Sequence, residues 1–183
     1  MRCCAKGVKW GNEVGEEILI VDGYNIINAW PELIKLKNES LEHARDRLLD
    51  LLSNFQGSTG FVVVVVFDAH LVKRGVGSKE SLPGLEIIFT QEGETADSCI
   101  ERLVTLMPRD IRITVATSDW AQQRLVMGQG ALRLSARELL MRIREAENQS
   151  RSSMQRGRKN NTTIHDVISA DIKATLEKWR RGK

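Results

Sequence analysis

Three aspartates follow short apolar runs that have the length of buried strands. They are Asp22 after residues 18–21, Asp68 after residues 61–67 and Asp119 after residues 111–116. Glu94 and Asp97 stand at the start of a predicted helix that follows another apolar run at residues 85–89. Ligands of open parallel sheets bind outside the carboxyl ends of the strands. We therefore expect these acidic side chains to gather at one edge of a sheet.

Crowded carboxylates repel one another, which raises the pKa of at least one of them, and a bound cation relieves the repulsion. Oxygen ligands select Mg²⁺ or Mn²⁺, and the usual zinc ligands, His and Cys, are missing from the predicted strand ends. Such an ion, held by a few carboxylates and water, commonly meets a phosphate and assists displacement at phosphorus. Taken singly, each acid could equally be a helix cap or a turn residue, and Asp119 is the most ambiguous.

The elements that must position these acids alternate along the chain. The predicted strands are residues 18–21, 61–67, 85–89, 111–116 and 131–134, and the predicted helices are 41–55, 95–107, 120–127 and one from the N-cap Ser135 to about 148. Alternating strands and helices indicate right-handed crossovers, hence an α/β fold with a central, mostly parallel sheet flanked by helices. The polar segment 69–84 is predicted to be a long basic loop.

Composition divides the chain into a leader, a body and a tail. Residues 1–16 are predicted to be a disordered leader, 17–150 a domain of the size of a small enzyme, and 151–183 a basic linker followed by a C-terminal helix. Residues 151–183 carry nine Lys and Arg against three Asp and Glu, a net of +6, whereas residues 1–150 carry a net of −3. A basic tail on an acidic body favours a polyanionic partner such as nucleic acid. A tail that only aids solubility is the plain alternative.

Several classes of protein are excluded or disfavoured. No apolar run reaches the roughly 20 residues of a transmembrane helix. Three cysteines without a CxxC motif argue against a disulfide scaffold and against a structural zinc site. The sequence has neither a P-loop nor a complete dinucleotide-binding glycine motif, and its histidines suit no Ser-His-Asp hydrolase. Without a secretory signal, we expect a cytoplasmic protein of a bacterium, or one of the plastid stroma, that is not secreted.

Four short motifs stand in an order that resembles a known family. They are Val21-Asp-Gly-Tyr-Asn-Ile-Ile27, Val66-Phe-Asp-Ala69, Gly93-Glu-Thr-Ala-Asp-Ser98 and Ala116-Thr-Ser-Asp119. The set is similar to the YacP-like branch of the NYN domains, within the PIN-like nuclease superfamily, over roughly residues 17–150. That resemblance implies a three-layer PIN-like fold and a Mg²⁺- or Mn²⁺-dependent endoribonuclease. Some members act on mRNA in the ribosomal A site, so mRNA and the ribosome are the implied partners.

The resemblance also implies roles for individual residues. Asp22, Asp97 and Asp119 would be catalytic, metal-binding acids. Asp68 would be a further metal ligand and Glu94 a secondary ligand or positioning group. Asn25 would orient a ligand or the scissile phosphate, although Asn is also a common turn residue. Residues 1–16 depart from the family pattern, as a start-site extension, a targeting segment or the remnant of a tag.

Basic and aromatic side chains supply the expected RNA or ribosome contacts. The candidates are Lys73, Arg74 and Lys79 of the loop, Arg151, Arg156, Arg158 and Lys159 of the tail, and Tyr24, whose ring could stack on a base. Each could instead be a solvated surface residue, and Tyr24 a buried one.

Two other functions compete with the nuclease. A PIN-like domain can serve as a catalytically silent RNA- or ribosome-binding adaptor, and the complete set of acids argues for activity. A phosphatase of small molecules is the third reading, and the open basic loop and basic tail argue against it, because small ligands favour enclosed pockets. The oligomeric state is left open by the sequence.

Overall fold

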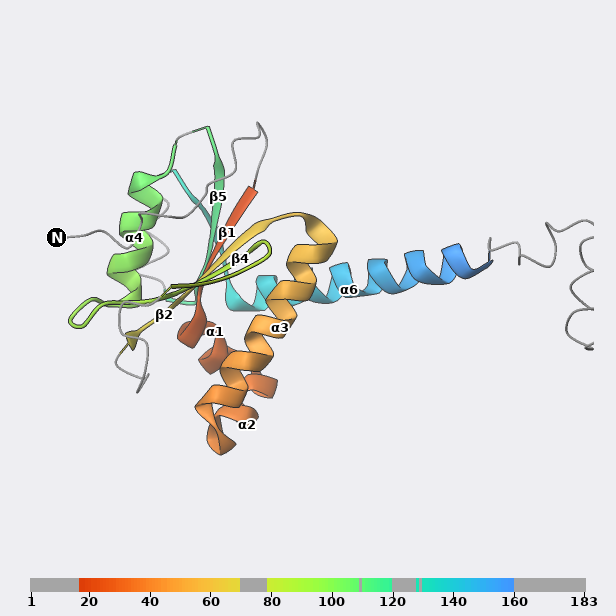
Figure 1. Cartoon of the computed structure of the whole chain (residues 1–183), viewed down its shortest axis with the longest axis horizontal. Coiled ribbons are helices and arrows are strands. Elements are labelled where there is room, and N and C mark those ends of the chain that lie inside the picture. The colour runs from red at the N-terminus through yellow and green to blue at the C-terminus, as the bar shows by residue number, and fades with distance from the viewer. Residues whose placement is uncertain (1–16, 70–78, 109, 120–127, 129, 160–183) are drawn as a thin grey trace, which may run out of the picture. The chain divides into compact units, whose positions relative to one another are not determined.

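The computed structural model describes residues 17–69, 79–108, 110–119, 128 and 130–159, and no side chain of residue 79 or of residues 153–159. The chain divides into two compact units, residues 1–147 and 148–183. The sheet belongs to the first unit (Figure 1). The predicted leader, the predicted helix 120–127 and the predicted C-terminal helix lie outside the described residues.

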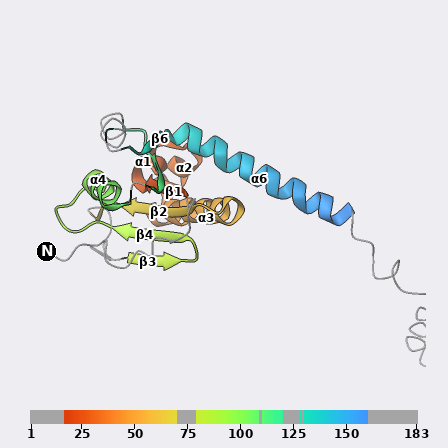
Figure 2. The same ribbon diagram turned by 90° about the horizontal axis from the view of Figure 1, so that it is seen from above.

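Six strands form one sheet in the order β3-β4-β2-β1-β5-β6. Their bounds are β1 Glu17–Asp22, β2 Val62–Phe67, β3 Lys79–Leu82, β4 Leu85–Phe89, β5 Arg112–Ala116 and β6 Leu132–Leu134. All the described neighbours pair in parallel except β3, which runs antiparallel to β4 at the edge of the sheet (Figure 2). The predicted α/β fold with a central, mostly parallel sheet is confirmed.

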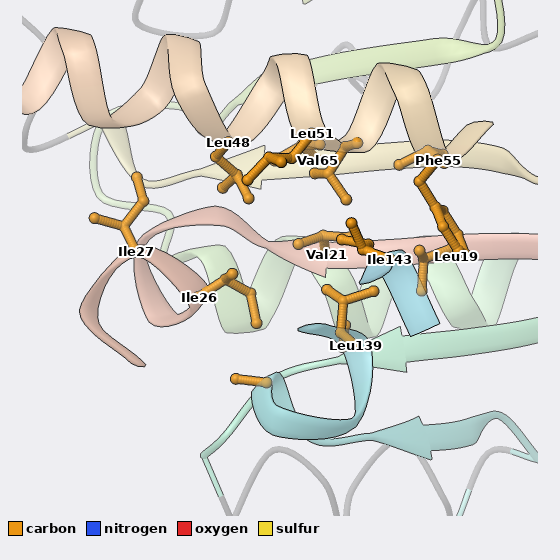
Figure 3. Close-up of a cluster of buried hydrophobic side chains, with 14 of the residues drawn as sticks. Leu19, Val21, Ile26, Ile27, Leu48, Leu51, Phe55, Val65, Leu139 and Ile143 are labelled. Carbon is orange, nitrogen blue, oxygen red and sulfur yellow. The ribbon is translucent and has the colours of Figure 1, made fainter. Parts of the chain in front are cut away.

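Helices cover both faces of this sheet, which gives three layers. The helices are α1 Gly23–Ala29, α2 Pro31–Glu39, α3 Leu41–Thr59, α4 Ala96–Leu106 and α6 Ala136–Lys159. One buried cluster joins the sheet to α1, α2, α3 and the first turns of α6. Figure 3 shows its side chains from the sheet, α1, α3 and α6. A second cluster joins the opposite face to α4.

The strand sequences explain why both faces are covered. Successive side chains of a strand point to opposite faces. In β1, Leu19 and Val21 belong to the first cluster, whereas Ile18 and Ile20 belong to the second. Because every one of these side chains is buried, the strand is a continuous apolar run, which is typical of a parallel sheet.

Side-chain caps mark the first turns of helices α4 and α6. The Thr95 side chain caps α4 by accepting a hydrogen bond from the backbone N of Ser98 at 3.2 Å. Ser135 and Glu138 form a capping box at the start of α6: the Ser135 N donates to Glu138 Oε2 at 2.8 Å and the Glu138 N to Ser135 Oγ at 3.3 Å. The N-cap predicted at Ser135 is therefore present, and Thr95 is the N-cap of α4.

Three details differ from the sequence expectation. Helix α6 continues to Lys159 rather than ending near 148. Only its first turns pack against the sheet, and the polar residues that follow can continue a helix without apolar spacing. The predicted loop 69–84 contains strand β3, which turns into β4 at Pro83 and Gly84. Helices α1 and α2 were not predicted, since Trp30 and Pro31 interrupt the helical spacing of residues 23–39.

Candidate active site

Asp22 is the last residue of β1 and the N-cap of α1. Its Oδ1 accepts a hydrogen bond from the backbone N of Asn25 at 3.1 Å. The residue is only 7% exposed, and burial raises the pKa of its carboxyl to about 6, although the bond from Asn25 acts in the opposite direction. Asp22 is therefore both a helix cap and a carboxylate that water solvates poorly.

Asp97 lies in the first turn of α4, directly after the cap formed by Thr95. Burial raises the pKa of the Asp97 carboxyl, and the negative charges of Asp119 and Asp68 raise it further. The N-terminal turn of a helix favours a carboxylate through its unpaired N–H groups. Burial and the neighbouring acids act against that preference at Asp97.

The register of the sheet brings the strand-end acids together. Asp22 pairs with Val66 in β2, so Asp68 lies two residues beyond that level. Val21 pairs with Ala116 in β5, and Asp119 follows three residues later. The charges of Asp97, Asp119 and Asp68 all raise the pKa of Asp22, as expected for four carboxylates at one edge.

Asn25 connects two of the segments that carry these acids. While its backbone N donates to Asp22, its side-chain Oδ1 accepts a hydrogen bond from the backbone N of Ser118 at 2.7 Å. Ser118 immediately precedes Asp119. The amide oxygen of Asn25 is thus engaged with the protein, which makes Asn25 a positioning residue in this structure.

Two threonines that the sequence analysis did not single out hold the other acid-bearing turns. The hydroxyl of Thr90, which follows β4, accepts a hydrogen bond from the backbone N of Ala69 at 2.9 Å and so fixes the residue after Asp68. The hydroxyl of Thr117 accepts from the backbone N of Asp119 at 3.1 Å. Both threonines are fully buried, and the signal that could have found them is a polar residue directly after an apolar strand.

The Glu94 carboxylate interacts with groups other than the four aspartates. Its Oε1 pairs with the guanidinium of Arg102 at 2.5 Å, and its Oε2 accepts from the backbone N of Gln91 at 3.4 Å. Glu94 does not contribute to the raised pKa of Asp22 or of Asp97. Its geometry suits a residue that fixes the turn before α4.

Tyr24 is a packed residue rather than an open stacking surface. It is 8% exposed, and its ring meets the ring of Phe67 edge-on with centroids 5.1 Å apart. A base cannot reach the face of a ring at that degree of burial without a rearrangement. The predicted stacking of Tyr24 on RNA therefore has no support in this structure.

The predicted basic contacts lie largely beyond what the structure describes. Lys73 and Arg74 are outside the described residues. Lys79 begins β3, and Arg156, Arg158 and Lys159 belong to α6, but the side chains of these four are not described. Arg151 is exposed on α6.

The sequence matches the YacP-like NYN domain over residues 19–181. The chain belongs to the YacP-like NYN domain family. It is 45% identical over 167 residues to the uncharacterized protein YacP of Bacillus subtilis (strain 168), covering 91% of this chain and 98% of that protein. In structure it is similar to the crystal structure of Rae1 (YacP) from Bacillus subtilis, with a TM-score of 0.69, 45% identity and coverage of 91% of this chain and 95% of that one. A tryptophan-to-leucine mutant of Rae1 matches with a TM-score of 0.67 and 39% identity over 88% of this chain and 98% of that one.

The YacP-like relationship confirms the family that the four motifs indicated, and it supports an RNA-related, nuclease-type role. None of the helices in the described part of the chain is long and apolar enough to cross a membrane.

The donor set of this YacP-like site fits a hard divalent cation in its chemistry, because four mutually repelling carboxylates offer oxygen ligands. Among the described residues, however, no three acidic, His or Cys side chains are close enough to hold one ion jointly. Mg²⁺ is commonly bound by one or two carboxylates and keeps several waters. Asp22 and Asp97, the two acids with raised pKa, are the residues that would hold such an ion, with Asp119 and Asp68 nearby.

Proposed function

We propose that this protein is a Mg²⁺- or Mn²⁺-dependent endoribonuclease that cuts RNA phosphodiester bonds, with mRNA on the ribosome as its substrate. The observation that carries the proposal is the convergence of four aspartates, in which burial and the charges of Asp119 and Asp68 raise the pKa of both Asp22 and Asp97. Four acids at the carboxyl edge of a parallel sheet form a site for a cation and a phosphate. The family relationship and the similarity to Rae1 support the same conclusion.

The residues of the site have separate tasks in this proposal. Asp22 and Asp97 hold the ion, and Asp119 and Asp68 complete the negative field around it. Asn25, Thr90 and Thr117 keep the acid-bearing turns in place through the hydrogen bonds described above. The ion, when bound, supplies positive charge that polarises the phosphate and acidifies an attacking water. We expect products with a 5′-phosphate and a 3′-hydroxyl.

Cleavage of a defined mRNA on translating ribosomes, beside the same RNA naked, tests the proposal. Wild type should cut in the presence of Mg²⁺ and the Asp97→Asn variant should not. Cleavage restricted to ribosomes supports a translation-dependent nuclease, whereas cleavage of naked RNA indicates a general ribonuclease. Equal behaviour of wild type and Asp97→Asn, or products ending in a 2′,3′-cyclic phosphate, would contradict the proposed mechanism.

The second candidate is a catalytically silent adaptor that binds RNA or the ribosome. The observation in its favour is that, in the described residues, no three potential ligands are close enough to hold an ion jointly. An adaptor would bind RNA or ribosomes equally well as wild type and as Asp97→Asn and would cut neither substrate, so the same experiment separates the two functions.

A further inference from the structure

Arg45 lies at the same edge of the sheet as the acidic side chains. Helix α3 packs on the sheet and leads directly into β2. Because the chain reverses direction between them, the first turns of α3 lie near the carboxyl end of β2. The guanidinium carbon of Arg45 lies 5.9 Å from the ring centre of Phe89, the last residue of β4. The ring of Phe89 stacks on that of Phe67 at 5.6 Å, and Phe67 directly precedes Asp68.

The aromatic rings hold the guanidinium against the protein. Phe89 provides a cation–π contact on one side of Arg45. Phe67 is in turn packed edge-on against Tyr24. Burial raises the pKa of the Tyr24 hydroxyl, the charge of Arg45 and a hydrogen bond from it lower that pKa, and the charge of Asp68 raises it. Arg45 and Asp68 therefore both lie near this hydroxyl.

Tyr24 and Arg45 interact directly, because a hydrogen bond from Arg45 is among the influences that lower the pKa of the Tyr24 hydroxyl. Arg45 Nη1 and Tyr24 Oη are both buried, and neither completes a hydrogen bond of full geometry within the described part of the chain. The outer nitrogen, Nη2, is 3.9 Å from Glu42 Oε1, at the limit of an ion pair, and the Glu42 side chain is 81% exposed. The Arg45 side chain keeps 15% exposure, so an anion can approach its outer edge.

We propose that Arg45 binds a backbone phosphate of the RNA next to the linkage that is cut, and that Tyr24 positions its guanidinium. This inference rests on the proposed function, because it assigns a part of the same substrate to the neighbouring residue. Four carboxylates at one edge repel a polyanion, so a cation beside them is needed to seat the chain. The planar fork of arginine matches the oxygens of a phosphate and forms charge-assisted hydrogen bonds with them. Glu42 is the carboxylate that the phosphate would displace.

The alternative role for Arg45 is purely structural, as a cover for Phe89 and a counter-charge for the acids. The two roles differ in the salt dependence of RNA binding. Each phosphate that a protein neutralises on single-stranded RNA contributes about 0.7 to the slope of log affinity against log salt. A structural residue changes stability but leaves that slope unaltered.

The test measures binding of a labelled single-stranded RNA in the presence of Mg²⁺, from low to physiological KCl, in the Asp97→Asn background. In that background Arg45→Met should weaken binding about tenfold at low salt and reduce the salt slope by about 0.7. The affinity of Arg45→Lys should lie between those of the Asp97→Asn parent and Arg45→Met, and Glu42→Gln should strengthen binding two- to threefold. The matched control is Arg47→Met on the same helix, which removes one charge from an exposed residue paired with Glu32 at 3.0 Å.

An unchanged slope in Arg45→Met, an equal loss in Arg47→Met, or no measurable binding by the parent protein at low salt overturns the inference. If Arg45→Met is too unstable to assay, the slopes of Arg45→Lys and Glu42→Gln decide. The proposed function fails separately. If wild type cleaves RNA and the salt slope does not depend on Arg45, only the phosphate contact of Arg45 is refuted. If binding depends on Arg45 but wild type does not cleave, only the proposed nuclease activity is refuted.

Discussion

The side-chain oxygen of Asn25 accepts a hydrogen bond from the backbone N of Ser118, 2.7 Å away and 93 residues later in the chain. The backbone N of Asn25 donates to Asp22 at the same time. One residue of α1 thereby links the acid at the end of β1 to the segment that carries Asp119. The relative placement of two acids of the candidate site depends on this bridge.

Replacing Asn25 by Ala should impair cleavage more than folding. The lost hydrogen bond to an exposed backbone N is expected to cost about 1 kcal/mol of the free energy of unfolding. Misplacement of Asp119 should reduce the rate of RNA cleavage about 10- to 100-fold, because small displacements of positioned groups have large effects. Urea unfolding and single-turnover cleavage measure the two effects.

Asn28→Ala is the matched control for that variant. Asn28 lies on the same helix, and its Oδ1 accepts a hydrogen bond from Lys37 Nζ at 2.6 Å on the surface. It should lose comparable or less stability and keep its cleavage rate. An equal fall in rate for both variants would mean that the bridge to Ser118 has no special role.

Replacing Asp22 by Asn should stabilise the metal-free protein at neutral pH. Because the pKa of Asp22 rises from 3.8 to about 6 on folding, the folded state binds its proton more tightly, and stability falls as the pH rises from about 4 to about 6. A shift of this size corresponds to at most about 3 kcal/mol above that range. Asn keeps the helix cap and cannot ionise.

Urea unfolding in EDTA at several pH values checks this prediction. The advantage of Asp22→Asn over wild type should be small near pH 4, grow as the pH rises and level off above about pH 6.5. The variant should nonetheless lose RNA cleavage. A constant difference in the free energy of unfolding between the two proteins across this range would show that folding does not raise the pKa of the Asp22 carboxyl.

Mg²⁺ or Mn²⁺ should raise the melting temperature of the wild-type protein. An ion that binds only the folded state stabilises it by RT ln(1 + [L]/Kd), which is about 1.4 kcal/mol at a concentration ten times the Kd. Asp22→Asn and Asp97→Asn should lose most of this effect, whereas Asp46→Asn, on an exposed position of α3, should keep it. Calorimetry with and without the ion measures it, and equal shifts in all four proteins would indicate nonspecific ion binding.

The elements that sequence could predict are those with one strong local signal. The valine run of β2 can only be a buried strand, and Thr95 and Ser135 mark helix starts through their hydroxyls. The strand ends then place Asp22 and Asp68 at one edge, because parallel strands leave no other arrangement. The bridge from Asn25 to Ser118 was beyond the sequence, since a contact across 93 residues depends on how α1 packs.

Other misses have the same origin in tertiary structure. The motif around Tyr24 shows an aromatic residue beside the acids but not the ring of Phe67 that packs against it. Arg45 is an ordinary charge in the spacing of α3, and only the folded chain brings its guanidinium over Phe89. Charge pairs such as Glu94 with Arg102 likewise became visible only with the structure.

The glycine after Asp22 is expected to be required by packing and not by backbone conformation. A Cβ added at Gly23 would lie 2.2 Å from the ring of Phe67, which is closer than packed atoms approach. Phe67 is fully buried between other core residues, so the ring has little room to move. Gly23→Ala should therefore cost about 1–3 kcal/mol of stability. Because α1 begins there, it should also displace Asp22 and reduce cleavage.

Gly57→Ala provides the opposite result with the same chemical change. Gly57 lies inside α3, and a Cβ there would meet nothing within 4 Å. Alanine is a better helix former than glycine by up to about 1 kcal/mol, so this variant should be more stable than wild type. Unfolding curves of the two variants measure the contrast. If Gly23→Ala matched Gly57→Ala in stability and activity, the contact between the start of α1 and Phe67 would not constrain the candidate site.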